Sequence, residues 1–452
     1  DGNNVLEVYE TISRLAKELR KGSGPVIVEA ITFRMRGHEE ASGVDYIPKS
    51  IFTKWAKKDP VENYKKYLKS KRILTDSMQK DITQRINNQI DPSFEIALNA
   101  AKPKSDVIKE INDVYKNYTF QSFPANDKGE EQRYIDSISN TLRSIMKKND
   151  KAIIMGQDIS QYGGVFKITK NFLEEFGSDR IRNTPIIESG ILGASVGLAL
   201  EGFKPIVEMQ FADFVSCGFN QIVNNIAKTH YRWNEALNIT IRMPYGGGMS
   251  AGPFHSQSPE AWFFHTPGLK IIAPSTPFDA KGLLNSSVED PNPILYFEHK
   301  YMYRSIKGLV PNDYYNIEIG KADIKKIGSD VSIITYGMGV HWMLDISKKL
   351  EKEGISIEII DLRSLIPWDK ELVEESISKT NRVLILHEAN LTGGIGAEIS
   401  AYISEKCFNF LDAPIMRLGA IDTPIPFSDE LEKGIYLPIN KIEQKIKELV
   451  NF

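Results

Sequence analysis

A regular alternation of short β-branched runs with longer helical stretches constrains the fold most strongly, and it extends from near residue 132 to the end of the chain. Strands that alternate with helices need right-handed crossovers, which build a mostly parallel sheet covered by helices on both faces. The predicted strands of the first series are 152–155, 205–209, 239–242 and 294–297, and its helices are 191–200, 218–228 and 277–288. This series predicts one doubly wound α/β domain over residues 132–305.

A second series of the same kind begins near residue 317. Its predicted strands are 331–335, 357–361 and 382–386, and its predicted helices are 343–353, 395–405 and 439–450. Because a chain of 452 residues is too long for a single hydrophobic core, a further domain is expected. We place this second α/β domain at residues 317–452.

The first hundred residues have a different pattern. Apolar residues at helical spacing predict a helix over 5–22, and the β-branched run 25–33 predicts a buried strand followed by an exposed polar loop at 34–46. This strand has no earlier strand to pair with in the sequence. We therefore expect this part to be the end of an α/β domain whose beginning is absent.

Lysine-rich helical sequence follows from about residue 52 to 101, and the next stretch is polar and carries prolines and glycine. The predicted divisions of this part are a first region at 1–103 and a linker at 104–131.

Charge and cysteine content exclude several classes of protein. The formal net charge of −3 provides no basic footprint for neutralising phosphates, so nucleic acid is not an expected partner. The two cysteines, Cys217 and Cys407, have neither disulfide nor zinc-ligand spacing. No apolar run approaches the roughly 20 residues that span a bilayer, so no membrane partner is expected. A reducing compartment fits: the cytoplasm, or the mitochondrial matrix in a eukaryote.

Two residues have positions suited to chemistry. Glu188 lies where a turn becomes an apolar helix, which predicts a largely buried carboxyl group. The structural alternative is a first-turn glutamate stabilised by the helix dipole. His255 follows the glycine-rich run 246–252, which allows backbone to approach a ligand closely; a single histidine can equally be structural. The glycine spacing matches neither a dinucleotide fingerprint nor a P-loop, so NAD and ATP are not indicated.

Longer segments carry a specific resemblance. Residues 132–452 are similar to the beta subunit of branched-chain 2-oxo acid dehydrogenases in the segments EMQFADF (208–214), HSQSPEA (255–261), DLRSLIPWD (361–369) and HEANLTGG (387–394). Residues 1–103 resemble the end of the alpha subunit through DGNNV (1–5), TFRMRGH (32–38) and WAKKDP (55–60). The resemblance implies a pyrimidine-binding domain and a transketolase C-terminal-like domain, preceded by a partial alpha segment with a helical region.

The resemblance implies thiamine diphosphate as cofactor. The family glutamate that matches Glu188 hydrogen-bonds the aminopyrimidine ring and drives its tautomerisation. Ile186, Gln210 and Phe214 match the other residues on the pyrimidine side, although Phe214 is often tyrosine in relatives and can also be read as core packing.

Two histidines match active-site positions of the family. His255 matches the histidine of the beta part. His38 matches the alpha-part histidine near the diphosphate and the reacting centre, with Arg34 beside it; solvent exposure is the alternative for a loop histidine. The resemblance therefore implies catalytic roles for Glu188, His255 and His38, and cofactor binding by Arg34 and His38 as well.

Two metal ions follow from the resemblance. Some relatives hold a potassium ion, and the matching positions are Leu237, Ile239, Thr240, Ser287, Asp290 and Asn292. Asp290 also belongs to a good turn sequence. The family binds magnesium with the diphosphate through a Gly-Asp-Gly motif, which does not occur in the first part of this sequence, so its ligands are expected in an absent segment.

The resemblance implies oxidative decarboxylation of a branched-chain, 3-methyl-2-oxobutanoate-like 2-oxo acid, with acyl transfer to a lipoyl group on an acyltransferase core. A homodimer of fused chains is expected. The alternatives are a pyruvate dehydrogenase or transketolase-like enzyme, and a noncatalytic assembly module.

Overall fold

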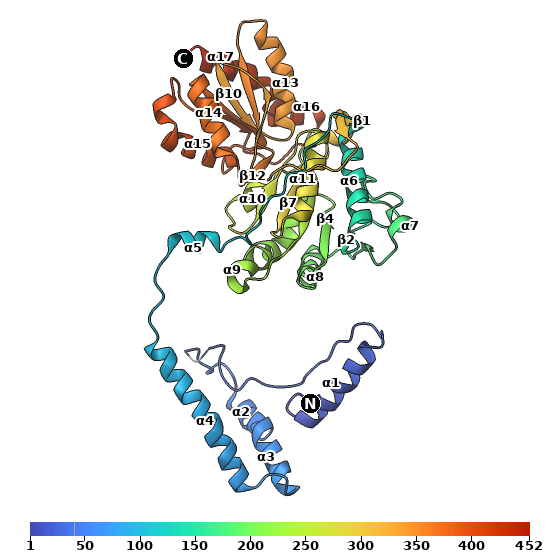
Figure 1. Cartoon of the computed structure of the whole chain (residues 1–452), viewed down its shortest axis with the longest axis vertical. Coiled ribbons are helices and arrows are strands. Elements are labelled where there is room, and N and C mark those ends of the chain that lie inside the picture. Colours follow the sequence, from blue (N-terminus) through green and yellow to red (C-terminus); the bar gives the residue numbers. More distant parts are fainter. Residues whose placement is uncertain (40) are drawn as a thin grey trace. The chain divides into compact units, whose positions relative to one another are not determined.

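The computed structural model describes residues 1–39 and 41–452, which divide into two compact units, Asp1–Ser105 and Asp106–Phe452 (Figure 1). The helices of the first unit are α1 (Val5–Leu19), α2 (Lys49–Ala56), α3 (Pro60–Ser70) and α4 (Asp76–Asn99). Local capping explains the starts of α1, α3 and α4, since Asn4, Asp59 and Thr75 each accept a backbone N–H of the first turn. None of these helices contains a fully buried residue.

The predicted strand at 25–33 is wrong. This segment has no regular secondary structure and pairs with no strand in the described part of the first unit, and Ile27 is 98% exposed. A backbone hydrogen bond from the Gly2 N–H to the Ile31 carbonyl, at 3.0 Å, ties it to the start of the chain. A β-branched run forms a strand only when a neighbouring strand completes its hydrogen bonds, and the described residues of this unit offer none.

A seven-stranded sheet forms the centre of the second unit, in the order β12-β6-β7-β5-β4-β2-β3. Its strands are β2 (Ala152–Gly156), β3 (Ile181–Asn183), β4 (Lys204–Glu208), β5 (Thr240–Tyr245), β6 (Lys270–Ile272), β7 (Ile294–His299) and β12 (Ser364–Ile366). All neighbours are parallel except β12, which is antiparallel to β6. The carboxyl ends of β4, β2, β5 and β7 therefore lie along one edge, where ligands of such sheets bind.

Helices cover both faces of this sheet. On one face α6 (Tyr134–Lys148) and α11 (Pro277–Glu289) pack in one apolar cluster with residues of β2, β4 and β7. On the other face lie α8 (Glu188–Leu200), the 3-10 turn η1 (Ala212–Gly218) and the π-helical turn η2 (Gln221–Ile226). The sequence predicted a single helix over 218–228, so the irregular η1 and η2 turns are a difference from that prediction.

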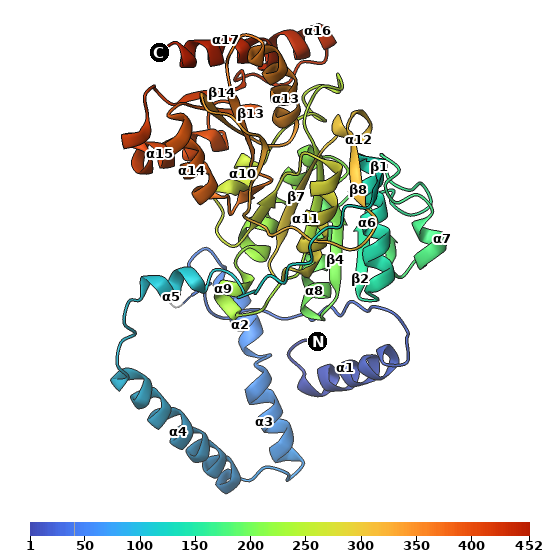
Figure 2. The same ribbon diagram turned by 45° about the horizontal axis from the view of Figure 1, so that its top comes forward.

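A five-stranded sheet follows, in the order β14-β13-β10-β11-β9, with β9 antiparallel and the others parallel. Its strands are β9 (Asp323–Lys326), β10 (Val331–Thr335), β11 (Ile357–Asp361), β13 (Val383–Asn390) and β14 (Met416–Ala420). One face packs on α13 (Met338–Glu351) and α17 (Ile439–Val450), which lie side by side in Figure 2. The other face packs on α14 (Lys370–Thr380) and α15 (Ile395–Lys406). Two mostly parallel sheets thus confirm the predicted α/β fold class.

The two α/β parts of the second unit share structure. β12 belongs to the later part of the sequence but pairs with β6 of the seven-stranded sheet. One apolar cluster also joins them, since it contains Val207 and Ile241 of the first sheet as well as Ile334 and Ile360 of the second. The segment before them contains α5 (Val107–Asn112) and β1 (Gly129–Arg133), which pairs antiparallel with β8 (Lys307–Pro311).

Candidate functional site

The candidate site is built around the start of α8. This helix is composed of small and apolar residues, and its first residue, Glu188, is only 8% exposed. The Glu188 Oε1 atom accepts a hydrogen bond from the Gln157 Nε2 atom at 3.0 Å. Within the described residues, the other carboxylate oxygen makes no hydrogen bond. A buried carboxylate therefore has one oxygen fixed and one available for a ligand.

The turn after β2 contributes two polar side chains. Gln157 and Asp158 follow directly on the fully buried strand, at its carboxyl end. Gln157 contacts Glu188 as described, and the Asp158 Oδ2 atom accepts a hydrogen bond from the Gln210 Nε2 atom at 2.9 Å. Two of the predicted pyrimidine-side residues, Glu188 and Gln210, are thus held from one turn. Neither Gln157 nor Asp158 was predicted from the sequence, although a polar pair that ends a buried parallel strand is a usable signal.

Aromatic rings surround His255. The imidazole makes edge-to-face contacts with Phe211, at a centroid distance of 4.8 Å, and with Phe214, at 5.5 Å. The predicted residues His255 and Phe214 therefore lie together, and η1 that carries Phe214 packs against α8. Lys300, another residue not predicted from the sequence, has its ammonium 5.8 Å from the centre of the Phe211 ring.

Lys300 supports the loop that leads to His255. It is only 3% exposed, and its Nζ atom donates to the Gly246 carbonyl at 2.6 Å. Burial lowers the pKa of Lys300 to about 8. In the same loop, the Gly247 N–H donates to the Glu388 carboxylate. The Glu388 Oε2 atom lies 2.6 Å from His299 Nε2. The glycine-rich run is thus anchored by buried charged groups of both α/β parts.

A buried ion network joins the carboxyl ends of β4 and β7 to the middle of β5. The Arg242 guanidinium donates to Glu298 at 2.7 and 2.8 Å and to Glu208 at 2.7 Å. Burial raises the pKa of Glu208, although Arg242 opposes the shift. Burial acts against the charged form of Arg242, but Glu298 and Glu208 hold its pKa above the ordinary value. This hydrogen-bonded network stabilises the end of β4, which is followed directly by Met209 and Gln210.

The other predicted cofactor residues are Ile186, Arg34 and His38. Ile186 lies two residues before Glu188 and is 85% exposed. Arg34 and His38 belong to the first unit and are exposed. Residue 40 of the predicted 34–46 loop lies outside the described residues.

The residues predicted to hold potassium are all buried. Asp290, however, is already paired, because one carboxylate oxygen forms an ion pair with Lys270 and the other accepts from Asn292. The Ser287 carbonyl accepts from the Thr240 hydroxyl at 3.3 Å. The set therefore fits a cation poorly, since its one carboxylate is neutralised by an ammonium group. Potassium stays a prediction, and no later argument depends on it.

Among the residues that the structure describes, no group of three or more His, Cys, Asp or Glu side chains could hold a metal ion. No helix in the same described part is long and apolar enough to cross a membrane. This finding leaves the magnesium prediction untested.

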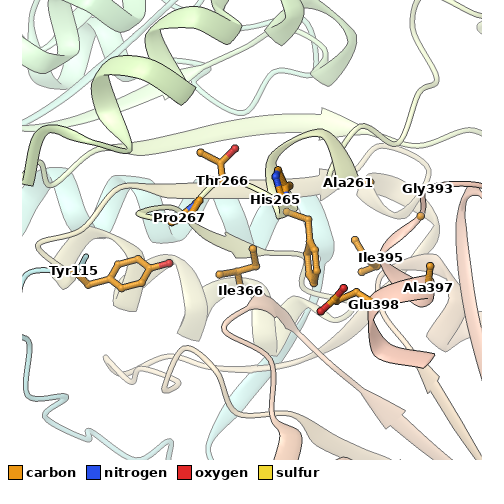
Figure 3. Close-up of a pocket in the computed structure, with 12 residues that line it drawn as sticks. Tyr115, Ala261, His265, Thr266, Pro267, Ile366, Gly393, Ile395, Ala397 and Glu398 are labelled. Atoms are coloured by element: carbon orange, nitrogen blue, oxygen red, sulfur yellow. The ribbon is translucent and has the colours of Figure 1, made fainter. Parts of the chain in front are cut away.

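A cavity of about 560 Å³ lies elsewhere in the second unit, between residues 261–267 and the start of α15 (Figure 3). Tyr115 lies at one end of the group of labelled side chains and Ala397 at the other, with Ile366 and Glu398 between them. None of the predicted cofactor residues lines this cavity. A second cavity of about 450 Å³ is closer to the candidate site, because Pro253 and Gln257, on either side of His255, line it.

Three protein families match the chain. Residues 1–106 match the dehydrogenase E1 component, residues 130–305 the transketolase pyrimidine-binding domain, and residues 320–442 the transketolase C-terminal domain. The pyrimidine-binding match covers Glu188, Gln210, Phe214 and His255.

Curated relatives point in the same direction. The 2-oxoisovalerate dehydrogenase subunit beta of Bacillus subtilis (strain 168) is 46% identical over 322 residues, covering 71% of this chain and 98% of that protein. The mitochondrial 2-oxoisovalerate dehydrogenase subunit beta 2 of Arabidopsis thaliana is 44% identical over 72% of this chain and 91% of its own length. The pyruvate dehydrogenase E1 component subunit beta of Staphylococcus aureus (strain Mu50 / ATCC 700699) is 41% identical over 70% of this chain and 98% of its own.

A solved structure has the same fold. It is described as a split gene transketolase, inactive beta4 tetramer, and it matches with a TM-score of 0.58 over 71% of this chain and 98% of its own. Its sequence identity is 22%, so it supports the fold alone.

Proposed function

Because the chain belongs to the thiamine-diphosphate-dependent E1 components of 2-oxo acid dehydrogenases, we propose that it takes part in the oxidative decarboxylation of a branched-chain 2-oxo acid. The acyl group then passes to a lipoyl group on an acyltransferase core. The observation that carries this proposal is the buried Glu188 carboxylate, with one oxygen fixed by Gln157 and the other available to a ligand.

The residues around Glu188 suit the pyrimidine end of thiamine diphosphate. A carboxyl group at a ring nitrogen can accept and return a proton, and partial burial strengthens that interaction. Gln210 offers an amide, and Phe214 offers an aromatic face or edge for packing. When bound, the cofactor supplies the carbon nucleophile and the electron sink for decarboxylation.

In this proposal Glu188 controls the proton at the pyrimidine ring. His255, half-buried between Phe211 and Phe214, donates or accepts a proton near the reacting atoms. Arg34 and His38 are assigned to the diphosphate side on the family resemblance alone. Magnesium enters as the counter-ion of the diphosphate.

The preference for a branched-chain substrate rests on the relatives. The two relatives named for 2-oxoisovalerate are 46% and 44% identical, and the one named for pyruvate is 41% identical. A pyruvate dehydrogenase is therefore the second candidate. The test is steady-state turnover of the complete enzyme with 3-methyl-2-oxobutanoate and with pyruvate. We expect a higher kcat/KM for the branched substrate, and a preference for pyruvate would select the second candidate.

The partners follow from the same class of enzyme. E1 components work with an acyltransferase core and form oligomers, and a pair of these chains is our proposal for the oligomer. α8 supports an interface, since Ile187 and Leu200 at its two ends are 53% and 50% exposed. The proposed location is the cytoplasm, or the mitochondrial matrix in a eukaryote. A noncatalytic assembly module is disfavoured, because such a module has no need of a buried, half-bonded carboxylate.

A further inference from the structure

The turn after β2 reaches two elements that are distant in the sequence. Gln157 Nε2 donates to Glu188 at the start of α8, and Asp158 accepts from Gln210 at the end of β4. The two contacts come from consecutive residues, which hold the two elements in a fixed relation. Asp158 has a φ of 57°, a left-handed conformation that aspartate and asparagine tolerate better than most residues.

We propose that Gln157 is a positioning residue that fixes the Glu188 carboxylate, and that Asp158 does the same, more weakly, for Gln210. This inference rests on the proposed function, because it concerns how Glu188 meets the pyrimidine ring. Gln157 acts only through Glu188 and touches no reacting atom.

The environment of Gln157 explains why it can fix the carboxylate. Its side chain is 7% exposed, and the preceding Gly156 is too close to the Glu208 carbonyl to carry a Cβ atom, which would lie 2.7 Å from that oxygen. The Asp158 carbonyl is in turn held by the Gly164 N–H at 2.8 Å. The backbone of the turn is therefore well defined on both sides of Gln157.

The chemistry of an amide also matters. A glutamate side chain has several rotatable bonds, and a hydrogen bond to one oxygen removes much of that freedom before a ligand binds. An amide N–H donates at every pH, because it does not ionise in the physiological range. Gln157 therefore directs the free oxygen of Glu188 toward a ligand without adding a second charge.

Asp158 is exposed, in contrast to Gln157, so its hydrogen bond to Gln210 competes with water. We expect a smaller contribution from this half of the turn. Asp158→Asn preserves both the left-handed backbone and an acceptor oxygen, whereas Asp158→Ala removes the acceptor.

A purely structural role is the alternative, in which Gln157 only satisfies a buried carboxylate. Two substitutions separate the roles. Gln157→Leu removes the donor at every pH. Gln157→Glu retains a donor only while one proton is shared between the two carboxyl groups, because like charges at hydrogen-bond distance do not both ionise readily. A positioning role therefore predicts pH-dependent rescue by Gln157→Glu.

The test is calorimetric titration of thiamine diphosphate with Mg²⁺ into the whole protein, from pH 5.5 to 8.5. We expect Gln157→Leu to weaken binding about tenfold at each pH, the effect of one charge-assisted hydrogen bond. Gln157→Glu should match the wild type at the acidic end and weaken as the pH rises. The matched control is Asn285→Leu in α11, which removes a buried amide that donates to the Tyr315 carbonyl. This control should leave the affinity for thiamine diphosphate unchanged.

The outcomes separate the inference from the proposed function. If the wild type binds and Gln157→Leu binds equally well, or if Gln157→Glu has a flat pH profile, the positioning role is overturned. A wild type that fails to bind thiamine diphosphate overturns the proposed function and this inference together. Thermal unfolding of each variant, measured in parallel, shows whether a loss of affinity reflects a loss of fold.

Discussion

The contacts and burial of Glu188 distinguish it from other glutamates that begin a helix. Many helices begin with a glutamate because the helix dipole favours a negative charge there. Glu188 differs in being 8% exposed and in having a buried amide on one oxygen. Its second carboxylate oxygen makes no hydrogen bond within the described residues and is available to a ligand.

We predict that Glu188→Gln abolishes turnover while the fold is retained. The amide preserves the shape and can still hydrogen-bond, but it cannot exchange a proton with the pyrimidine ring. The loss should be roughly a thousandfold or more in kcat, as expected when a required proton transfer is removed. The measurement is steady-state turnover of the complete enzyme, with the melting temperature as a check. Glu201→Gln, at the exposed end of the same helix, is the control. A Glu188→Gln enzyme with a tenth of wild-type turnover would refute the assignment.

Glu260 provides a pH prediction away from the cofactor residues. Burial raises the pKa of Glu260 to about 7, although the hydroxyl of Tyr336, which donates to its carboxylate, opposes the shift. The folded protein therefore binds more protons than the unfolded chain between about pH 4.5 and 7, and stability falls as the pH rises through this range. Glu260→Gln keeps an acceptor for Tyr336 and removes the charge. We expect the variant to be more stable than the wild type above pH 7, by up to about 3 kcal/mol, and to lose this advantage below about pH 4.5.

Urea unfolding of both proteins at a series of pH values measures this difference directly. Comparing the variant with the wild type cancels the titration of other groups, such as His387, whose pKa burial lowers to about 4. A stability difference that does not change with pH would contradict the prediction.

Sequence predicted part of the site and missed another part for a physical reason. Glu188, Gln210, Phe214 and His255 were predicted through the family resemblance, and contacts in the structure link Glu188 and Gln210 through one turn and Phe214 to His255. Their roles stay predictions. Gln157 could not be assigned from the sequence because its partner lies 31 residues away, on another element. Side-chain contacts of this kind depend on the strand order, which local patterns do not specify.

Buried parallel strands were the most predictable elements. β10 and β11 begin and end where the β-branched runs predicted, because strands buried on both faces are almost wholly apolar. The run at 25–33 has the same composition but forms no strand in the described residues. Composition identifies a segment that can become a strand, and only a neighbouring strand makes it one.

Gly268, in the connection just before β6, gives a prediction about stability. Gly268 has a φ of 97°, and a Cβ atom there would lie 1.9 Å from the Ala227 carbonyl oxygen after η2. Gly177 has a similar φ of 79° but no atom within 4 Å of the added Cβ. Gly268→Ala should therefore cost more than about 3 kcal/mol of stability, and Gly177→Ala about 1–3 kcal/mol, the cost of its glycine-specific backbone conformation (ψ 166°) alone. Denaturant unfolding of the two variants tests this, and equal losses would show that the close contact relaxes at little cost.

On the scale of the second unit, the two sheets are joined by more than a linker. β12 pairs with β6, and one apolar cluster contains strands of both sheets. Charged side chains also cross the junction, since Arg363 donates to Asp279 at 3.1 Å and Glu388 lies 2.6 Å from His299. Separating the two parts would expose the shared cluster and leave these charges without partners.

We therefore predict that the two α/β parts of the second unit unfold as one cooperative structure. The decisive variant is Ile442→Ala in α17, because Ile442 is fully buried in the cluster on the face of the second sheet that α13 and α17 cover, and that cluster contains no residue of the first sheet. The substitution should cost about 2–5 kcal/mol. Native-state hydrogen exchange then reports each strand separately. If unfolding is cooperative, the amides of β2 in the first sheet lose as much protection as those of β10 in the second, because both exchange through the same global opening. Unchanged protection in β2 would show that the shared cluster does not couple the two parts and that each unfolds alone.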